Sequence, residues 1–234
     1  MKSTWFSKKE HHEFGKLLRD ADNSHGLWDN FNTFIECGFC SLSQAVRKLQ
    51  TGSVSEDVEK QYMREVSRVK HADKLAEALS VMVLALEKYG AYDFLGTVAS
   101  ELELLNSNMG QFFTPAPVAD LLASMNFAGI KPDPRNRLRL CEPACGGGAT
   151  ILPAARQLHN AGFTASDYWV DAIDLDPRMY KICYMQMTLC GVAGRVYNDN
   201  TLSMEMHDSM PTLTGVLHPW KDKPRPRKRV LPRG

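Results

Sequence analysis

The stretch CEPACGGGAT, residues 141–150, places an acidic residue beside three consecutive glycines, directly after the apolar-alternating segment RLRL. Glycine has no Cβ, so a glycine turn at the end of a strand lets the backbone come very close to a bound molecule. Glu142 lies at the start of this turn, where its negative charge would repel a pyrophosphate. The stretch therefore favours a ligand that carries positive charge.

A dinucleotide-binding loop does not fit these glycines. Its pattern is G-x-G-x-x-G/A, and counting from Gly146 puts Gly148 at the third place but the bulky Ile151 at the sixth. S-adenosylmethionine suits Glu142 better, because this cofactor carries a sulfonium and an ammonium group and has no phosphate. A glycine run taken alone is also typical of a plain turn.

Two further polar positions follow at the ends of predicted strands. Asp174 lies in AIDLDP, where its carboxylate could accept hydrogen bonds from both ribose hydroxyls of a nucleoside. Asn200 lies in NDNTL, where its side-chain carbonyl could accept from an adenine amino group. A lone Asp at such a place is also typical of a helix cap, which is the role we expect for Asp176 before Pro177.

The elements that must position these residues alternate between strand and helix. Such alternation predicts an α/β fold with a parallel sheet and right-handed crossovers. Ligands of such sheets bind beyond the carboxyl ends of the strands, which is where the glycine stretch lies. The predicted strands cover residues 137–143, 168–177 and 194–199, and the predicted helices cover residues 150–162 and 178–192.

The first hundred residues have apolar positions spaced three and four apart, which is typical of helices. A cap-like Ser55 opens one of these helices and Gly90 ends another. The predicted helices cover residues 29–49, 55–69, 74–90 and 92–105. We therefore expect a helical N-terminal module over residues 1–107, a ligand-binding domain over residues 108–220 and a separate tail over residues 221–234.

The net charge of +1 hides a basic tail. The last 14 residues contain seven Lys or Arg and one Asp, a charge of +6, which leaves −5 for the rest of the chain. With three prolines, this tail is expected to be disordered or extended and to bind the phosphates of DNA, although a merely solubilising tail is the alternative. Its basic residues are Lys221, Lys223, Arg225, Arg227, Lys228, Arg229 and Arg233.

The remaining composition indicates an ordinary globular protein, with 44% hydrophobic and 24% charged residues. No apolar stretch is long enough for a membrane helix, and the N-terminus has no apolar signal-peptide core, so we expect a cytoplasmic protein. Cys37 and Cys40, in CGFC, could bind zinc or form a redox pair, but ordinary burial in a helix is favoured because no second ligand pair lies nearby. We expect no metal site, and a solvated helix start for His11 and His12.

Beyond these local signals, NMGQFFTPAPVADLL (residues 108–122), CEPACGGGAT, AIDLDP and NDNTL together resemble the N6-adenine DNA methyltransferases of the type I restriction-modification kind. The segment DFLGTVASELE (residues 93–103) is similar to the helix before the GQFFTP box in that family, and short phage- or plasmid-type relatives have a similar layout. The resemblance implies a class I, Rossmann-like fold that binds S-adenosylmethionine and acts on DNA.

The resemblance also implies which residues bind the cofactor. The GQFFTP box would cover its methionine and adenine ends, because adjacent aromatic rings form a flat apolar wall. The glycine loop would form the floor, Asp174 would bind the ribose and Asn200 the adenine. The implied set is Gln111, Phe112, Phe113, Thr114, Pro115, Glu142, Pro143, Ala144, Gly146, Gly148, Asp174, Leu175 and Asn200. For FFTP alone, a buried turn before a helix over residues 118–125 is the alternative.

The sequence departs from the family at the catalytic loop. These enzymes flip the target adenine out of the duplex and bind its amino group with an Asn/Asp-Pro-Pro-aromatic loop. No such tetrapeptide occurs in the chain, and the nearest match, LHPW, has Leu217 where the amide or acid should be. Leucine cannot accept the amino protons, so the catalytic residues stay unknown. The later strands of the usual sheet and a target-recognition domain are also not recognisable.

Two functions stay open at this point. The first is an S-adenosylmethionine-dependent adenine-N6 DNA methyltransferase, or the cofactor-binding part of one, with a partner protein supplying target recognition or the missing catalytic half. The second is a catalytically inactive accessory protein of a mobile element that binds the cofactor and DNA or a restriction complex. A small-molecule methyltransferase and an NAD-dependent oxidoreductase are disfavoured, because no base or acid marks the former and the glycine pattern fails for the latter.

Overall fold

The computed structural model describes residues 8–104 and 114–220, together with the backbone of residues 228–229. The chain divides into two compact units. One comprises residues 1–90 and 94–113, and the other comprises Ala91–Asp93 and residues 114–234. None of the helices formed by the described residues is long and apolar enough to span a membrane.

The described part of the first unit is helical, as its apolar spacing predicted. The Ser55 side chain accepts a hydrogen bond from the Val58 backbone N–H and caps a helix, and Gly90 ends another, so both predicted boundaries are confirmed. Cys37 and Cys40 are buried in one of these helices, and burial raises the pKa of the Cys37 thiol to about 12. The helices are α1 (Lys9–Ala21), α2 (Leu27–Thr51), α3 (Glu56–Val66), α4 (Ala72–Tyr89) and α5 (Phe94–Glu101).

His11 corrects one expectation. Instead of lying at a solvated helix start, its side chain is fully buried in the first unit, and its Nδ1 atom lies 2.9 Å from Glu101 Oε2. Its ring meets that of Phe94 edge to face, beside the Phe14 ring. Burial lowers the pKa of His11, so this histidine is a packed residue of the helical core.

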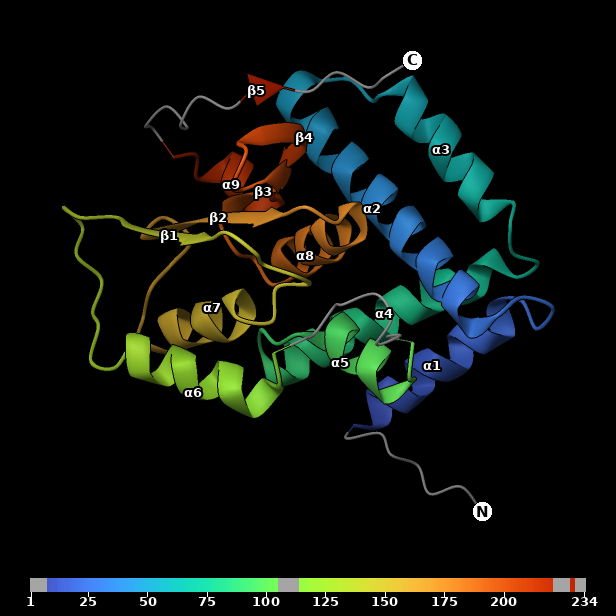
Figure 1. Ribbon diagram of the computed structural model, residues 1–234, viewed down its shortest axis with the longest axis horizontal. Helices are drawn as coiled ribbons and strands as arrows, with labels where there is room; N and C mark the ends of the chain where they lie inside the picture. Colours follow the sequence, from blue (N-terminus) through green and yellow to red (C-terminus); the bar gives the residue numbers. More distant parts are fainter. Residues whose placement is uncertain (1–7, 105–113, 221–227, 230–234) are drawn as a thin grey trace. The chain divides into compact units, whose positions relative to one another are not determined.

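The second unit is the predicted α/β sheet domain. The alternation of strands and helices matches the prediction, and β2 is buried almost throughout, as central parallel strands are. Figure 1 shows the order of its elements. They are α6 (Ala116–Asn126), β1 (Leu138–Glu142), α7 (Ile151–Asn160), β2 (Tyr168–Asp174), α8 (Pro177–Leu189), β3 (Gly194–Asn200), β4 (Glu205–Pro211), α9 (Leu213–Leu217) and β5 (Lys228–Arg229).

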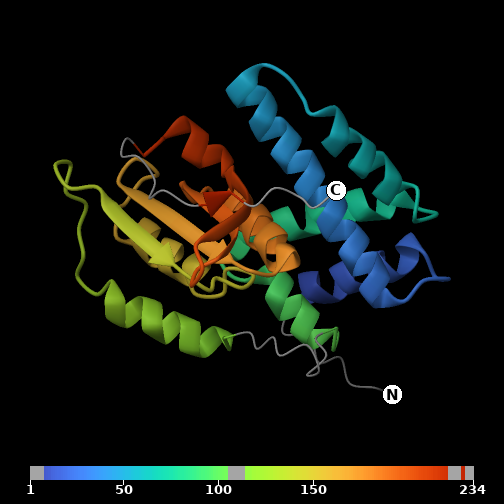
Figure 2. The same ribbon diagram turned by 45° about the horizontal axis from the view of Figure 1, so that its top comes forward.

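Strands β1, β2 and β3 are parallel and lie in sequence order, with Leu140 opposite Val170 and Ala172 opposite Val196. The crossovers β1–α7–β2 and β2–α8–β3 therefore run in the same direction along the sheet. Right-handed crossovers that run in one direction place their helices, here α7 and α8, on the same face of the sheet. In Figures 1 and 2, α6 and α7 lie on one side of the β1–β2 part of the sheet and α9 lies on the other. This arrangement confirms the Rossmann-like α/β class.

One edge of the sheet departs from a purely parallel arrangement. β4, which the sequence did not predict, pairs antiparallel with β3, and β5 of the basic tail pairs with β4 in parallel. The backbone of Lys228 and Arg229 is thus extended, one of the two states expected for the tail. At the other edge, β1 is the end strand of the sheet among the described residues.

The absence of a side chain at Gly194 lets β2 and β3 approach closely, which gives a first prediction. A Cβ at this position would collide with the Val170 carbonyl oxygen of β2, a backbone atom that cannot rotate away. We expect Gly194→Ala to lower the free energy of unfolding by about 3 kcal/mol, the upper end of the usual cost of overpacking. Urea denaturation of the purified chain measures the loss.

The matched control is Gly129→Ala, where φ is +70° but a Cβ would meet no atom within 4 Å. This change adds only the strain of a left-handed backbone, about 1 kcal/mol. Equal stability losses for the two variants would contradict the close approach of β2 and β3 at Gly194.

Candidate functional site

The glycine run forms a tight turn between β1 and α7. The Gly148 N–H donates to the Cys145 carbonyl oxygen at 2.9 Å, which closes the turn over Gly146 and Gly147. Gly146 and Gly148 have φ values of 53° and 101°, a region that residues with a Cβ rarely adopt. A Cβ built on Gly146 would meet no atom within 4 Å. The turn therefore has open space directly beside its backbone.

Asp174, the last residue of β2, contacts this turn. Its Oδ2 atom accepts a hydrogen bond from the Gly146 N–H at 2.8 Å, and its Oδ1 atom accepts from the Asp176 N–H at 2.9 Å. Burial raises the pKa of the carboxyl group, and the two backbone hydrogen bonds oppose that shift. The residue expected to bind a ribose thus also connects the loop after β1 to the end of β2.

Glu142, the last residue of β1, flanks the turn on its other side. The Thr150 hydroxyl donates to its Oε2 atom at 2.9 Å, and the Ala144 N–H donates to its Oε1 atom at 3.3 Å. The next residue, Pro143, accepts a hydrogen bond through its carbonyl from the Thr201 hydroxyl at 2.6 Å. The carboxyl ends of β1 and β2 therefore bring two carboxylates and a glycine turn together, as the sequence predicted.

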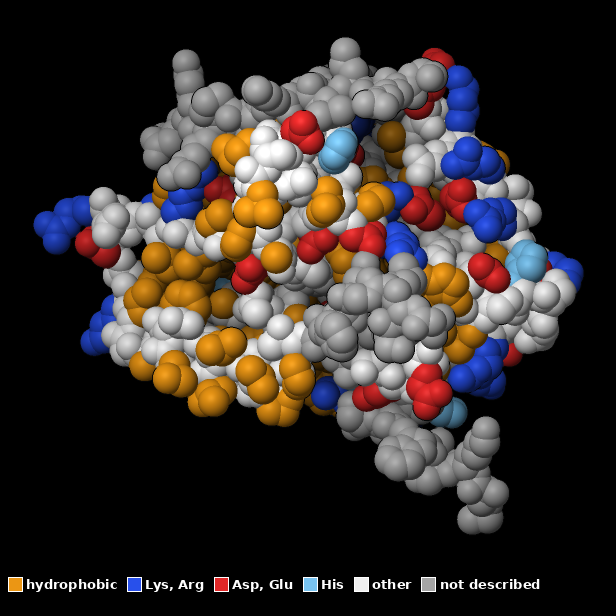
Figure 3. All heavy atoms as spheres, viewed as in Figure 1, with side chains coloured by type: hydrophobic (Ala, Val, Ile, Leu, Met, Phe, Trp, Pro, Cys, Tyr) orange, Lys and Arg blue, Asp and Glu red, His pale blue; other side chains and the backbone are white. Residues whose placement is uncertain are grey.

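A cavity of about 280 Å³ lies between α6, β1 and α7. Leu122, Leu140 and Ile151 contribute to its apolar wall, and Glu142 and Thr150 form part of its polar lining. Figure 3 shows hydrophobic side chains gathered over this region of the sheet unit. The cavity offers space for an apolar group next to a carboxylate.

The third strand contributes a residue that the sequence did not single out. The Asn198 side chain donates to the backbone carbonyls of Asp174 and Leu175 at 3.1 and 2.9 Å, so it fixes the end of β2. Asn200, the predicted adenine contact, accepts through Oδ1 from the backbone N–H groups of Leu202 and Ser203 and stabilises a turn. Leu175 is 58% exposed beside this end of the sheet.

A second unpredicted contact comes from α8. The Gln186 side chain is fully buried and donates to the Gly147 carbonyl of the turn. The only signal in the sequence is a glutamine inside the otherwise apolar stretch ICYMQMTLC, since a buried amide needs partners. Asp176 caps α8 through the Arg178 N–H, as expected.

The structure describes only the last two residues of the predicted GQFFTP box. Gln111, Phe112 and Phe113 lie outside the described residues. Thr114 and Pro115 are described, and Pro115 occupies the position just before α6. The predicted helix after the box is confirmed as α6.

Cys145 lies inside the turn but offers no thiolate. A hydrogen bond with Cys183, together with burial, raises the pKa of the Cys145 thiol well above its usual range. The thiol is neutral at physiological pH, and a neutral thiol is a poor nucleophile. The chemistry that the described residues support at this point is therefore binding through carboxylates and backbone groups.

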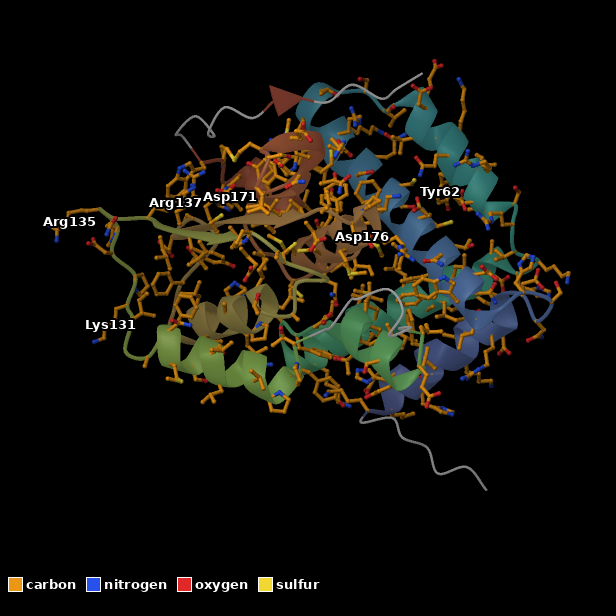
Figure 4. The ribbon with its side chains drawn as sticks, in the orientation of Figure 1. Tyr62, Lys131, Arg135, Arg137, Asp171 and Asp176 are labelled. Carbon is orange, nitrogen blue, oxygen red and sulfur yellow. The ribbon has the colours of Figure 1, made fainter. Side chains whose placement is uncertain are left out.

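The segment LHPW, the nearest match to a catalytic loop, lies at the opposite end of the sheet. Arg137, just before β1, donates to the His218 and Pro219 carbonyls at 2.8 and 2.9 Å, and its guanidinium lies over the Trp220 ring. Figure 4 labels Arg137 and Asp176 at opposite ends of the β1–β2 region. LHPW thus packs at the amino end of β1, roughly 15 Å of strand from the glycine turn.

Comparison with known protein families shows the family to which the chain belongs. The family model "N-6 DNA Methylase" matches residues 91–223, more than half of the chain. No curated protein is significantly similar to the chain.

Two solved structures are similar to the chain at low identity. One is the methyltransferase subunit of a type I restriction-modification system from Streptococcus thermophilus, with 15% identity, a TM-score of 0.40, and coverage of 83% of this chain and 58% of that one. The other is a putative class I S-adenosylmethionine-dependent methyltransferase from Listeria monocytogenes, with 14% identity, a TM-score of 0.41, and coverage of 83% and 54%. The chain thus spans little more than half the length of either.

The buried carboxyl group of Asp174 gives a pH-dependent prediction. Because its folded-state pKa is raised, its contribution to stability falls as pH rises from its ordinary pKa of 3.8 through the folded value. Asp167 is the matched control, because hydrogen bonds from Thr164 lower its pKa. Its contribution is present above pH 3.8 and is lost as pH falls through its folded value.

Urea denaturation between about pH 3 and pH 7 compares the parent with Asp174→Asn and Asp167→Asn. We expect the stability of the parent relative to Asp174→Asn to decrease with rising pH, and its stability relative to Asp167→Asn to increase. The same sign for both variants would contradict the burial of Asp174.

Proposed function

From the membership of this chain in the N-6 DNA methylase family, we propose that the sheet unit binds S-adenosylmethionine and serves the methylation of adenine N6 in DNA. The observation that supports this function is the pair of carboxylates, Glu142 and Asp174, on either side of a glycine turn. They lie at the carboxyl ends of neighbouring parallel strands, the usual ligand position of such sheets.

The residues around the turn suit the cofactor. When bound, S-adenosylmethionine supplies the methyl group. Asp174 retains lone pairs for ribose hydroxyls beyond the two that accept backbone N–H groups, since a carboxylate has about four acceptor sites. Glu142 offers negative charge to a cationic ligand, and the open space at Gly146 admits it close to the backbone.

The other proposed contacts surround this centre. Pro143, Ala144 and Gly148 belong to the same loop, and Leu175 follows Asp174. Asn200 would reach the adenine by exchanging its local turn contacts for the amino group. The GQFFTP residues Gln111, Phe112, Phe113, Thr114 and Pro115 complete the proposed set.

The groups that act on DNA are proposed to come in part from a second polypeptide. β1 is the end strand among the described residues, and the sheet order extends from it in one direction only. Next to it, α6 exposes the apolar side chains Val118, Leu121, Leu122 and Met125, along the lower edge of Figure 3. Exposed apolar patches of this kind are typical of protein interaction sites.

The basic tail and the cysteines bear on the partner of the chain and on its location in the cell. The basic tail is proposed to bind DNA phosphates, since Lys and Arg side chains neutralise them without regard to sequence. A cytoplasmic location is proposed as well, and it accords with the free thiol state of all six cysteines.

A second candidate function is a catalytically inactive protein that binds the cofactor and DNA or a restriction complex. The observation that favours it is the position of LHPW, which packs against Arg137 at the amino end of β1. The sequence contains no Asn/Asp-Pro-Pro-aromatic tetrapeptide that could take the place of LHPW beside the glycine turn. The two candidates share the cofactor site and differ in methyl transfer.

Calorimetry with S-adenosylmethionine tests the site that both candidates share. We expect the purified chain to bind the cofactor and Asp174→Ala to abolish measurable binding, because the variant loses the ribose acceptor and frees the Gly146 N–H. Asp167→Ala, which changes an acid in the turn just before β2, should bind like the parent. Absence of binding by the parent would contradict both candidate functions.

Transfer of a labelled methyl group to adenine in DNA separates the candidates. Because the orienting loop is missing from the sequence, we expect the purified chain alone to give no methyl transfer. The chain mixed with cell extract should give transfer above the background of the extract alone. Asp174→Ala with the same extract is the control and should remain at background. Transfer by the purified chain alone would show that other residues orient the adenine, and background transfer in every mixture would favour the inactive candidate.

A further inference from the structure

Gln186 is the one fully buried amide side chain that contacts the glycine turn among the described residues. It lies on α8, and its Nε2 atom donates to the Gly147 carbonyl oxygen and to Asp93 Oδ1, both at 2.8 Å. Asp93 ends the three-residue segment Ala91–Asp93, which belongs to the sheet unit. Two oxygen atoms face the same nitrogen, so the amide has one orientation only, with its NH₂ group toward both acceptors.

The hydrogen bond from Gln186 and a second hydrogen bond within the turn act on the same peptide group, the one between Gly147 and Gly148. Gly147 contributes the carbonyl that Gln186 binds, and Gly148 contributes the N–H that donates to the Cys145 carbonyl at 2.9 Å. A peptide group is planar, so fixing its oxygen on one side and its hydrogen on the other fixes the orientation of the whole plane. Gln186 and Cys145 together determine this orientation.

Glycines cannot provide that orientation themselves. Residues 146–148 have no Cβ and adopt many backbone conformations at similar energy, so the turn depends on contacts from outside. On one side Asp174 accepts from the Gly146 N–H at 2.8 Å, and on the other side Gln186 donates to the Gly147 carbonyl. The Gly148 carbonyl in turn accepts from the Leu152 N–H at 3.0 Å and starts α7.

We propose that Gln186 is a positioning residue for the cofactor site, which fixes the Gly147–Gly148 peptide group and thereby the shape of the turn beside Asp174. Asp93 orients the amide of Gln186 from the far side. The inference rests on the proposed function only for the identity of the ligand. The ordering of the turn follows from the hydrogen bonds and is measurable without any ligand.

Gln186→Leu, which keeps a similar volume and removes the donor, tests the inference. A buried carbonyl without a donor is unfavourable, so the Gly147–Gly148 peptide rotates and the Gly148 N–H leaves the Cys145 carbonyl. We expect faster amide hydrogen exchange at Gly148 in the free chain and roughly tenfold weaker binding of S-adenosylmethionine by calorimetry. Asp93→Asn keeps the Gly147 contact and should weaken binding less, about threefold.

Gln44→Leu is the matched control. Gln44 is a buried glutamine of the helical unit whose side chain donates to the Ser55 carbonyl and accepts from the Ser55 N–H. We expect Gln44→Leu to lower the melting temperature but to leave both Gly148 exchange and cofactor affinity unchanged. A merely structural role for Gln186 would make the two glutamine variants behave alike.

Two measurements on Gln186→Leu can overturn the positioning role. Unchanged Gly148 exchange in a folded Gln186→Leu chain would overturn the positioning role, and so would full cofactor affinity. If Gln186→Leu does not fold, Asp93→Asn decides the question by the same two measurements. Faster Gly148 exchange in a chain whose parent binds no S-adenosylmethionine would support the role of Gln186 and contradict the proposed function, so the two failures are distinguishable.

Discussion

The hydrogen bond from the Gly146 N–H to the Asp174 carboxylate is the contact on which the candidate site depends. It joins the loop after β1 to the end of β2, two segments 28 residues apart in sequence. Burial of the carboxylate is unfavourable and raises the pKa of Asp174, and hydrogen bonds from backbone N–H groups offset part of that cost. The same carboxylate has acceptor capacity left, so the group that stabilises the loop is also available to a ligand.

This contact explains why the surrounding polar residues lie where they do. Asn198 binds the two carbonyls at the end of β2, and Gln186 binds the carbonyl of the turn, so each fixes a different backbone group next to Asp174. Glu142 is fixed through Thr150 at the start of the next helix. The site is therefore a set of backbone segments held by side chains from β1, β2, α8 and β3.

The sequence predicted those parts of the fold and site that follow from local chemistry. Apolar spacing predicted helices α2 to α5, and the alternation of strands and helices predicted the parallel sheet with α7 and α8. The glycine run with Glu142 and Asp174 predicted where a site would lie. The sequence did not predict β4, because that strand mixes polar and apolar residues and is defined by its pairing with β3. His11 and Gln186 were also not foreseen as buried, because their partners Glu101 and Asp93 are 90 and 93 residues away.

The proposed cofactor site and the nearest match to a catalytic loop lie at opposite ends of β1. The carboxylates and the glycine turn lie at the carboxyl ends of β1 and β2, whereas LHPW, the nearest match to an orienting loop, packs on Arg137 at the amino end. A methyl donor and an adenine must meet within a few ångströms for in-line attack, so a group at the far end of β1 cannot direct the reaction. Within the described part of the sheet β1 is the end strand, so a group that orients the adenine would have to come from elsewhere, as the proposed second polypeptide would provide.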